Sequence, residues 1–131
     1  MAEGQWSQSL VGTVVHGQRL GHQLGFPTAN LNPADVQVEA LRPGVYAAWA
    51  TLEDGRRYRS MVNIGYRPTV DKQHHTLSIE AHLHDFEGDL YDKRLRLDIV
   101  GWIRDERRME SLDQLKAQLT KDLSEAVDRL P

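Results

Sequence analysis

The chain has 131 residues, which is the size of one compact domain. Its 19 acidic and 16 basic residues give a net charge of −3, whereas proteins that coat nucleic acids carry a basic excess. Cysteine is absent, which excludes disulfides, thiolate metal sites and cysteine nucleophiles. No apolar run approaches the ~18 residues that span a bilayer. We therefore expect one cytoplasmic domain over residues 1–131, residues 1–9 being a flexible extension, with no nucleic-acid or membrane partner.

The first part of the chain is predicted to form two strands separated by a loop. The β-branched residues Val11, Thr13 and Val15 alternate with their neighbours and predict a short strand. Three glycines and a proline interrupt every periodic pattern in residues 17–27, so neither a helix nor a regular strand is expected there. Residues 28–31 begin a second predicted strand.

Residues 44–52 and 58–64 are two apolar runs that flank Asp54-Gly55. An Asp-Gly pair in this position favours a tight type I′ turn, which needs a positive φ at both central residues. The two runs are therefore predicted to form an antiparallel hairpin.

The second part of the chain predicts two more strands and one helix. Residues 77–84 and 94–103 alternate apolar and polar side chains. Ser111 and Gln114 form a capping-box signature at the start of a helix. Its apolar face comprises Leu112, Leu115, Leu119, Leu123, Val127 and Leu130. The order of about six strands and a C-terminal helix favours a small antiparallel barrel, with the helix across one opening or face.

A glycine-rich loop and two polar residues after it are candidates for binding an anion and its metal. Glycines at residues 17–25 would let backbone amides approach a phosphate closely, although glycine content alone favours an ordinary loop between strands. Thr28 and Asn30 are two apart in an extended segment, so they share one side. Their neutral oxygens suit Mg²⁺ bound with nucleotide phosphates; the alternative is a pair of hydrogen bonds that fix a turn.

Glu80 lies in the middle of a predicted strand, where glutamate is disfavoured unless its face is exposed or functional. Its carboxylate is a candidate general base. His82 and His84 follow on the same face, which leaves open a metal site or simply a hydrated surface. Farther along, Arg104 and Arg107 are candidates for holding a planar ligand, the alternative being a solvated charged loop.

Several blocks of the sequence resemble riboflavin kinases, and together they extend from about Gly12 to Leu130. The most specific is Leu24-Gly25-Phe26-Pro27-Thr28-Ala29-Asn30-Leu31. The others are Gly12-x-Val14-Val15-x-Gly17, Gly44-Val45-Tyr46-Ala47, Val62-Asn63-Ile64-Gly65-x-x-Pro68-Thr69, Ile79-Glu80-Ala81-His82, Asp85-Phe86-x-Gly88-Asp89-Leu90-Tyr91 and Ile103-Arg104-x-Glu106-x-x-Met109-x-Ser111-Leu112.

The resemblance implies a mainly β fold, a six-stranded antiparallel Greek-key barrel with a C-terminal α-helix. It implies Glu80 as the catalytic base, and Thr28 and Asn30 as residues of the Mg²⁺–nucleotide site. By the same transfer, ATP contacts are expected at Gly17, His22, Thr28, Asn30, Leu83, His84 and Tyr91, and riboflavin or FMN contacts at Arg104, Arg107 and Met109. Three positions depart from the family pattern: His16 and His22, where basic residues are common, and Met109, where an aromatic residue is usual.

The implied activity is transfer of the ATP γ-phosphoryl group to the 5′-hydroxyl of riboflavin, with Mg²⁺ as cofactor. The partners would be riboflavin and ATP, and we expect a monomer. We expect the FMN-adenylylating half of the bifunctional bacterial proteins to be absent. Two alternatives remain open: a non-catalytic flavin carrier or sensor on the same barrel, and a metal-dependent enzyme that uses Glu80, His82 and His84.

Overall fold

The computed structural model describes residues 8–16, 25–36, 41–68 and 75–131. It contains strands β1 (Gln8–Val15), β2 (Ala29–Leu31), β3 (Gly44–Leu52), β4 (Arg57–Pro68), β5 (His75–Leu83) and β6 (Arg94–Asp105), a short 3₁₀ turn η2 (Pro33–Asp35), and helix α2 (Leu112–Arg129). The strands expected from the sequence are all present. Strand β1 begins at Gln8, within the extension expected over residues 1–9.

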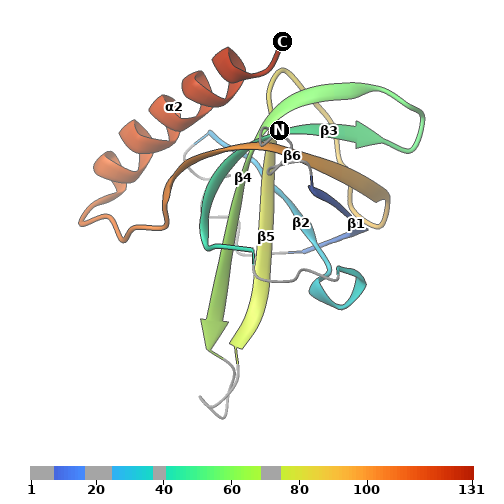
Figure 1. The fold of residues 1–131 in the computed structure, drawn as a ribbon, viewed down its shortest axis with the longest axis horizontal. Helices are drawn as coiled ribbons and strands as arrows, with labels where there is room; N and C mark the ends of the chain where they lie inside the picture. Colours follow the sequence, from blue (N-terminus) through green and yellow to red (C-terminus); the bar gives the residue numbers. More distant parts are fainter. Residues whose placement is uncertain (1–7, 17–24, 37–40, 69–74) are drawn as a thin grey trace.

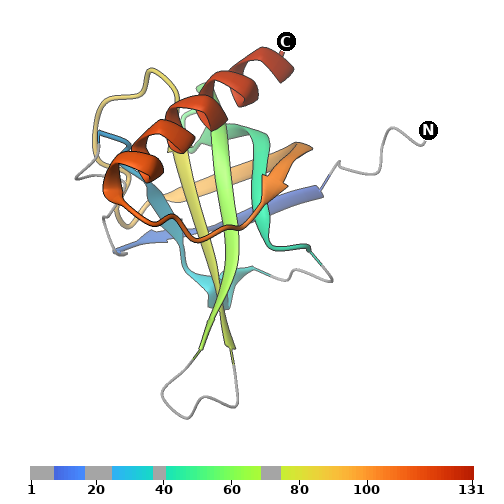
Figure 2. The same cartoon turned by 90° about the vertical axis from the view of Figure 1, so that its left-hand side faces the viewer.

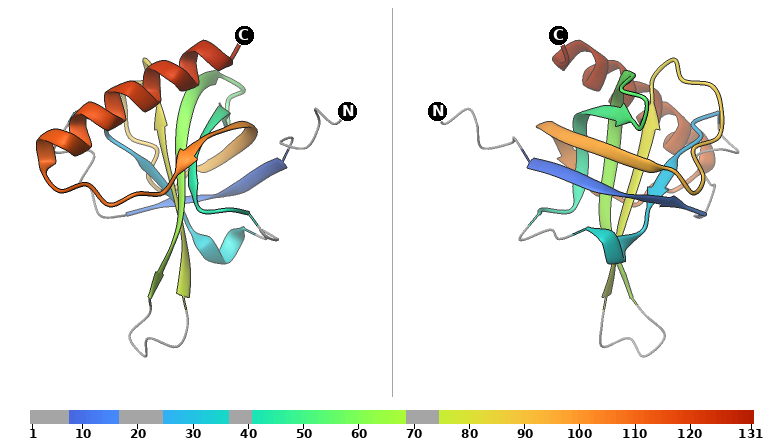
Figure 3. Two further views of the ribbon diagram at one scale, coloured as in Figure 1. Left: turned by 60° about the vertical axis from the view of Figure 1, so that its left-hand side comes forward. Right: turned by 90° about the vertical axis from the view of Figure 1, so that its right-hand side faces the viewer.

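The six strands form a closed antiparallel barrel in the order β1-β2-β5-β4-β3-β6, which confirms the predicted fold class. Hairpins join β3 to β4 and β4 to β5, whereas the β2–β5 and β1–β6 pairs connect strands distant in sequence. Strands β4 and β5 continue together beyond the rest of the barrel (Figure 1). The β1 and β6 strands lie side by side, with the helix behind them (Figure 3, right). Among the described residues every strand has a neighbour on each side, although β1 and β2 pair only at Val14–Leu31 and Val15–Asn30.

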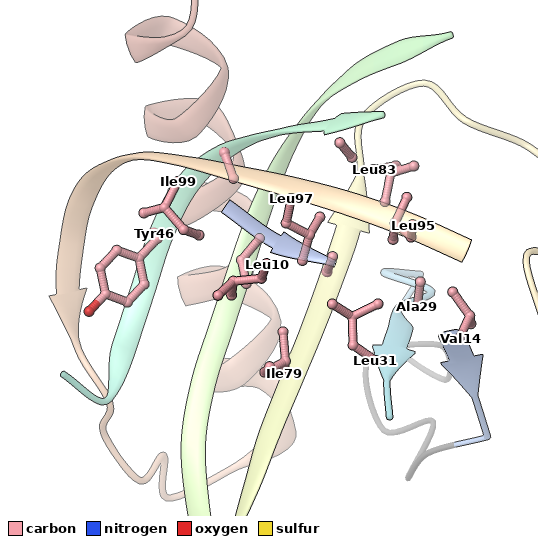
Figure 4. Packing of buried hydrophobic residues seen from close by; sticks show 14 of the residues in the cluster. Leu10, Val14, Ala29, Leu31, Tyr46, Ile79, Leu83, Leu95, Leu97 and Ile99 are labelled. Carbon is pink, nitrogen blue, oxygen red and sulfur yellow. The ribbon is translucent and has the colours of Figure 1, made fainter. Parts of the chain in front are cut away.

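Alternating residues of every strand point inward and fill the barrel. Figure 4 shows this core, with Tyr46 at one end and Val14 at the other. Leu10, Leu31, Ile79, Leu97 and Ile99 are almost completely shielded from solvent, together with Tyr46, Val62, Ile64, Ala81 and Leu95. The residues between them in each strand therefore point outward, which fixes the direction of every polar side chain on the barrel wall.

The turn between β3 and β4 differs from the predicted type I′ turn. Leu52 accepts a hydrogen bond from the Gly55 amide at 2.9 Å, and its own amide donates to the Arg56 carbonyl at 2.9 Å. Gly55 has φ 92°, whereas Asp54 has no positive φ. The prediction of a two-residue turn was wrong because the loop is longer; the Asp54 carboxylate accepts a hydrogen bond from the Arg56 amide, which stabilises this wider turn.

Helix α2 runs obliquely across the outer side of the barrel (Figure 2). Of the two positions predicted for the helix, it therefore occupies the face of the barrel and not its opening. Its cap is as predicted, since the Ser111 hydroxyl accepts from the Gln114 amide at 3.1 Å. Ala126 of the helix and Leu130, the residue after it, pack against Val45, Ala47 and Met61 on the outer face of β3 and β4. A second apolar cluster therefore fastens the helix to the barrel outside the main core.

Candidate functional site

A cavity of about 540 Å³ opens at the end of the barrel where Val14 lies. It is lined by the end of β1 (Val14, Val15, His16), by β2 and the residues before it (Pro27, Thr28, Ala29, Asn30), by the end of β5 (Ala81, Leu83) and by the connection from Phe86 to Tyr91. Ligand pockets for nucleotide-sized molecules have volumes of about 300–1,000 Å³. The cavity is therefore large enough for such a ligand.

The wall formed by the β5–β6 connection is anchored to the barrel at both ends. The His84 amide donates to the Arg59 carbonyl at 2.7 Å, and the Asp92 amide donates to the Val14 carbonyl at 2.8 Å. Asp85 and Asp92 have φ values of 63° and 69°, a conformation that aspartate tolerates better than most residues. These two turns set the course of the chain around the cavity mouth.

Two aromatic rings stack at the rim of this cavity. His16 follows β1 and Tyr91 belongs to the β5–β6 connection; their ring centroids are 3.8 Å apart and the planes differ by 16°. Tyr91 remains 46% exposed, so one part of its ring surface is accessible. An exposed aromatic ring beside a cavity can contact the flat face of a nucleobase.

Three polar side chains form a row across the outer face of β2, β5 and β4. Glu80 is the register partner of Asn30 on one side and of Asn63 on the other. Direct cross-strand partners have Cβ atoms about 4.5–5.5 Å apart, so these side chains are within reach of one another. The Ser78 hydroxyl also lies 3.4 Å from Glu80 Oε2. Since Asn30 lines the cavity, the row places the Glu80 carboxylate next to its edge.

The row continues across β3 to an ion pair at the helix. Asn63 is paired with Val45, which is in turn paired with Arg104 on β6. The Arg104 guanidinium donates to both carboxylate oxygens of Asp122, at 2.8–3.0 Å. Asp122 is only 1% exposed and also accepts from the Gln118 amide at 2.9 Å. This pair joins helix α2 to the end of β6.

His82 connects the barrel wall to the segment that carries Thr28. Its Nδ1 lies 2.8 Å from the Pro27 carbonyl oxygen, so this nitrogen carries the proton and donates. The Phe26 ring meets the imidazole edge-on at 5.3 Å. Burial lowers the pKa of His82, against the opposing effect of the Pro27 hydrogen bond, and the neighbouring His84 lowers it further. The neutral ring therefore holds Pro27, at the start of the cavity wall that precedes β2.

The predicted site residues fall into two groups in the structure. Thr28, Asn30, Leu83 and Tyr91 all line the cavity, and Glu80 lies beside it. His84 does not line it; its Nε2 lies 3.3 Å from Asp85 Oδ2. Gly17 and His22 lie outside the described residues.

The second group of predicted residues lies between β6 and helix α2. Nε and Nη2 of Arg104 donate to Asp122, and Arg107 Nη2 lies 3.4 Å from Gln118 Oε1. Met109 is partly buried in the segment before the helix. Among the described residues, no three His, Asp or Glu side chains are arranged to hold a metal ion, so Glu80, His82 and His84 do not form the alternative metal centre.

Two residues of this region, Asp122 and Asn63, are not predicted as site residues from the sequence. Asp122 follows Leu119 by three positions and lies beside Leu123, within the apolar stripe of the helix. A lone carboxylate in such a stripe is a usable signal of a buried ion pair. Asn63 lies in the Val62-Asn63-Ile64-Gly65 block, but an asparagine in mid-strand has no pattern that indicates a role.

The fold and the site together define a small β-barrel with a nucleotide-sized cavity and a carboxylate at its edge. The family model of riboflavin kinase, called Flavokinase, matches residues 5–130. The chain belongs to the riboflavin kinase family. No helix in the described residues is long and apolar enough to cross a membrane.

Individual relatives agree with this family. The chain is 41% identical over 115 residues to an RNA-binding riboflavin kinase of Bacillus subtilis, covering 88% of this chain and 48% of the relative. It is 42% identical over 122 residues to a bifunctional riboflavin kinase/FMN adenylyltransferase of Pseudomonas fluorescens, covering 89% of this chain and 36% of the relative. The chain thus spans about half, or less, of the length of these two proteins.

Two solved structures share the fold. A crystal structure described as a macrolide-efflux protein from Streptococcus pneumoniae superposes with a TM-score of 0.80 at 31% identity, covering 90% of this chain and 38% of that one. Riboflavin kinase from Trypanosoma brucei superposes with a TM-score of 0.65 at 24% identity, covering 93% and 76%. The second likeness, at this identity, concerns the fold alone.

Proposed function

We propose that this protein transfers the γ-phosphoryl group of ATP to the 5′-hydroxyl of riboflavin, giving FMN and ADP. The observation that carries the proposal is the position of Glu80, whose register partner Asn30 lines the cavity. A base beside a nucleotide-sized cavity is what transfer to a hydroxyl requires. The family uses ATP and a divalent metal, which is compatible with this arrangement.

The nucleotide would occupy the cavity between β1, β2 and the β5–β6 connection. Thr28 and Asn30 offer a hydroxyl and an amide oxygen, donors that suit Mg²⁺ when most of its ligands are water and phosphate. These two residues would hold the ion, which neutralises charge on the phosphates when bound. Further ATP contacts are proposed at Gly17, His22, Leu83, His84 and Tyr91.

Riboflavin would lie on the other side of Glu80, toward helix α2, with contacts at Arg104, Arg107 and Met109. Two nitrogens of the Arg104 guanidinium donate to Asp122 and the third donates to the Asp105 carbonyl, so its contribution would come from the flat face of the guanidinium and from holding the helix in place. Met109 would pack against the flavin ring through its polarizable sulfur.

The reaction follows from these two positions. The 5′-oxygen attacks the γ-phosphorus, a new P–O bond forms, and the bond between the γ-phosphorus and the bridging oxygen breaks to release ADP. Glu80 accepts the hydroxyl proton as this happens. Asn30 and Asn63 are the register partners of Glu80 on the two neighbouring strands.

Incubation with riboflavin, ATP and Mg²⁺, followed by chromatography, tests the proposal. FMN and ADP in equal amounts are the expected products. Tight riboflavin binding without FMN would instead support the flavin carrier or sensor; no present observation favours it.

We also propose that the protein acts as a monomer in the cytoplasm without a nucleic-acid partner. The cysteine-free composition supports a reducing compartment, and the net charge of −3 supports the absence of a nucleic-acid partner. Light scattering at several protein concentrations tests the monomer. A gel-shift titration at physiological salt tests RNA binding, which the name of the Bacillus subtilis relative makes relevant.

A further inference from the structure

One polar atom on the barrel wall is shielded from solvent and has no hydrogen-bond partner in the part of the chain that the structure describes. This atom is Oδ1 of Asn63, on β4. An acceptor left unsatisfied in this way destabilises a folded protein, and nearly all buried polar groups in native proteins have a partner. We therefore look for a hydrogen-bond donor to this atom in a bound molecule.

The surroundings of Asn63 show where a partner would come from. On β4, Met61 precedes it on the same outer face and packs under helix α2. Gly65 follows it on that face, and the Glu106 carboxylate lies where a Gly65 side chain would begin. Across the sheet, Asn63 faces Glu80 on one side and Val45 on the other. The side chain of Asn63 therefore has apolar neighbours and two carboxylates around it.

These neighbours select the chemistry of the missing partner. The amide oxygen needs a hydrogen-bond donor. A phosphate offers only acceptors at neutral pH and would be repelled by Glu80 and Glu106. A hydroxyl is a neutral donor, and a polyol carries several hydroxyls at the spacing of successive carbons. Because Glu80 and Asn63 are neighbours in this row, two hydroxyls of one polyol molecule could each bind one of these two side chains.

We propose that Asn63 binds the ribityl chain of the flavin substrate, its Oδ1 accepting a hydrogen bond from the 4′- or 3′-hydroxyl while Glu80 accepts the proton of the 5′-hydroxyl. This inference rests on the proposed function and extends it to a second residue. Asn63 thereby orients the 5′-oxygen, because a chain held at two adjacent points has few remaining conformations.

The test compares riboflavin with 4′-deoxyriboflavin and 3′-deoxyriboflavin in the wild type and in Asn63→Leu, a variant of similar size without the acceptor. Met61→Leu, on the same face two residues away, is the matched control. We expect Asn63→Leu to lower kcat/KM for riboflavin by about 3- to 10-fold, the range of one neutral hydrogen bond, without changing KM for ATP. For one of the two deoxy analogues, wild type and Asn63→Leu should have equal kcat/KM.

A stability measurement separates this role from a structural one. Removing an unpaired acceptor should leave the urea midpoint of the ligand-free protein unchanged or raised, whereas loss of a structural contact would lower it. The proposal would be overturned if Asn63→Leu lost the same factor in kcat/KM with riboflavin and with both analogues, or lost nothing with riboflavin. A lowered urea midpoint of Asn63→Leu would also overturn it.

Failure of the underlying function has a different signature. If the wild type forms no FMN, the proposed function fails, and the same comparison is made on flavin dissociation constants from fluorescence quenching. If Asn63→Leu weakens binding of riboflavin but not of one deoxy analogue, the contact between Asn63 and that hydroxyl is supported. If the substitution changes all three dissociation constants equally, the proposal is overturned.

Discussion

Asp122 of helix α2 holds Arg104 of β6 through three hydrogen bonds of 2.8–3.0 Å. The carboxylate is 1% exposed and the Arg104 side chain 18%. A buried pair of this kind is costly to break, because the remaining partner is left without its counter-charge. The pair connects the only described long helix to the strand that ends beside the proposed flavin site.

Asp122→Asn should therefore destabilise the protein strongly. We expect a loss of about 3–5 kcal/mol in the free energy of unfolding, measured by urea denaturation. Glu125→Gln is the control, because it removes the exposed ion pair with Arg129 on the same helix, which is worth about 0–1 kcal/mol. Equal effects of the two substitutions would show that the Arg104–Asp122 pair has no special structural role.

His82 predicts a pH dependence of stability. Because burial lowers its pKa in the folded state, the unfolded chain binds the proton more readily. The contribution of the neutral ring is complete above about pH 6.5, the ordinary histidine pKa, and is lost as the pH falls toward the lower folded value. His82→Gln keeps a donor for the Pro27 carbonyl but does not titrate.

The slope of stability against pH measures this effect. Between pH 6.5 and 5, the wild type should lose stability more steeply than His82→Gln, by at most about 1.4 kcal/mol per pH unit. Above pH 7 the two curves should run parallel. Parallel curves over the whole range would mean that His82 has the same pKa in both states.

Thr28 provides a test of the nucleotide side. Thr28→Val removes the hydroxyl at the cavity wall and keeps the shape of the side chain. KM for MgATP should rise about 10-fold, as expected for one lost polar contact to a charged ligand, while the riboflavin dissociation constant stays unchanged. Thr120→Val on the exposed helix surface is the control. An unchanged KM for MgATP would remove Thr28 from the nucleotide site.

Much of the fold is predictable from local pattern. The strict alternation of residues 77–83 corresponds to β5, and the apolar stripe after Ser111 corresponds to α2. The pairings that close the barrel, β2 with β5 and β1 with β6, join residues far apart in sequence. No local pattern specifies such pairings, and only the resemblance implied them.

In the site, too, some features follow from local sequence and others depend on how the strands pair. Thr28 and Glu80 are predicted from residue type; in the structure Thr28 lines the cavity, and Glu80 is the register partner of Asn30, which also lines it. The row that links Asn30, Glu80 and Asn63 depends on the register of three strands, which a one-residue shift would destroy. Such a row becomes visible only once the strands are paired.

The most direct test of the account is the rate of FMN formation by the wild type and by Glu80→Gln, with riboflavin and MgATP at saturation. The substitution keeps the size of the side chain but removes the base, so turnover should fall by about 10²–10⁴-fold. Riboflavin binding, followed by flavin fluorescence, should change little. Near-normal turnover in Glu80→Gln would contradict the assignment of Glu80 as the base, and no FMN from the wild type would contradict the proposed activity.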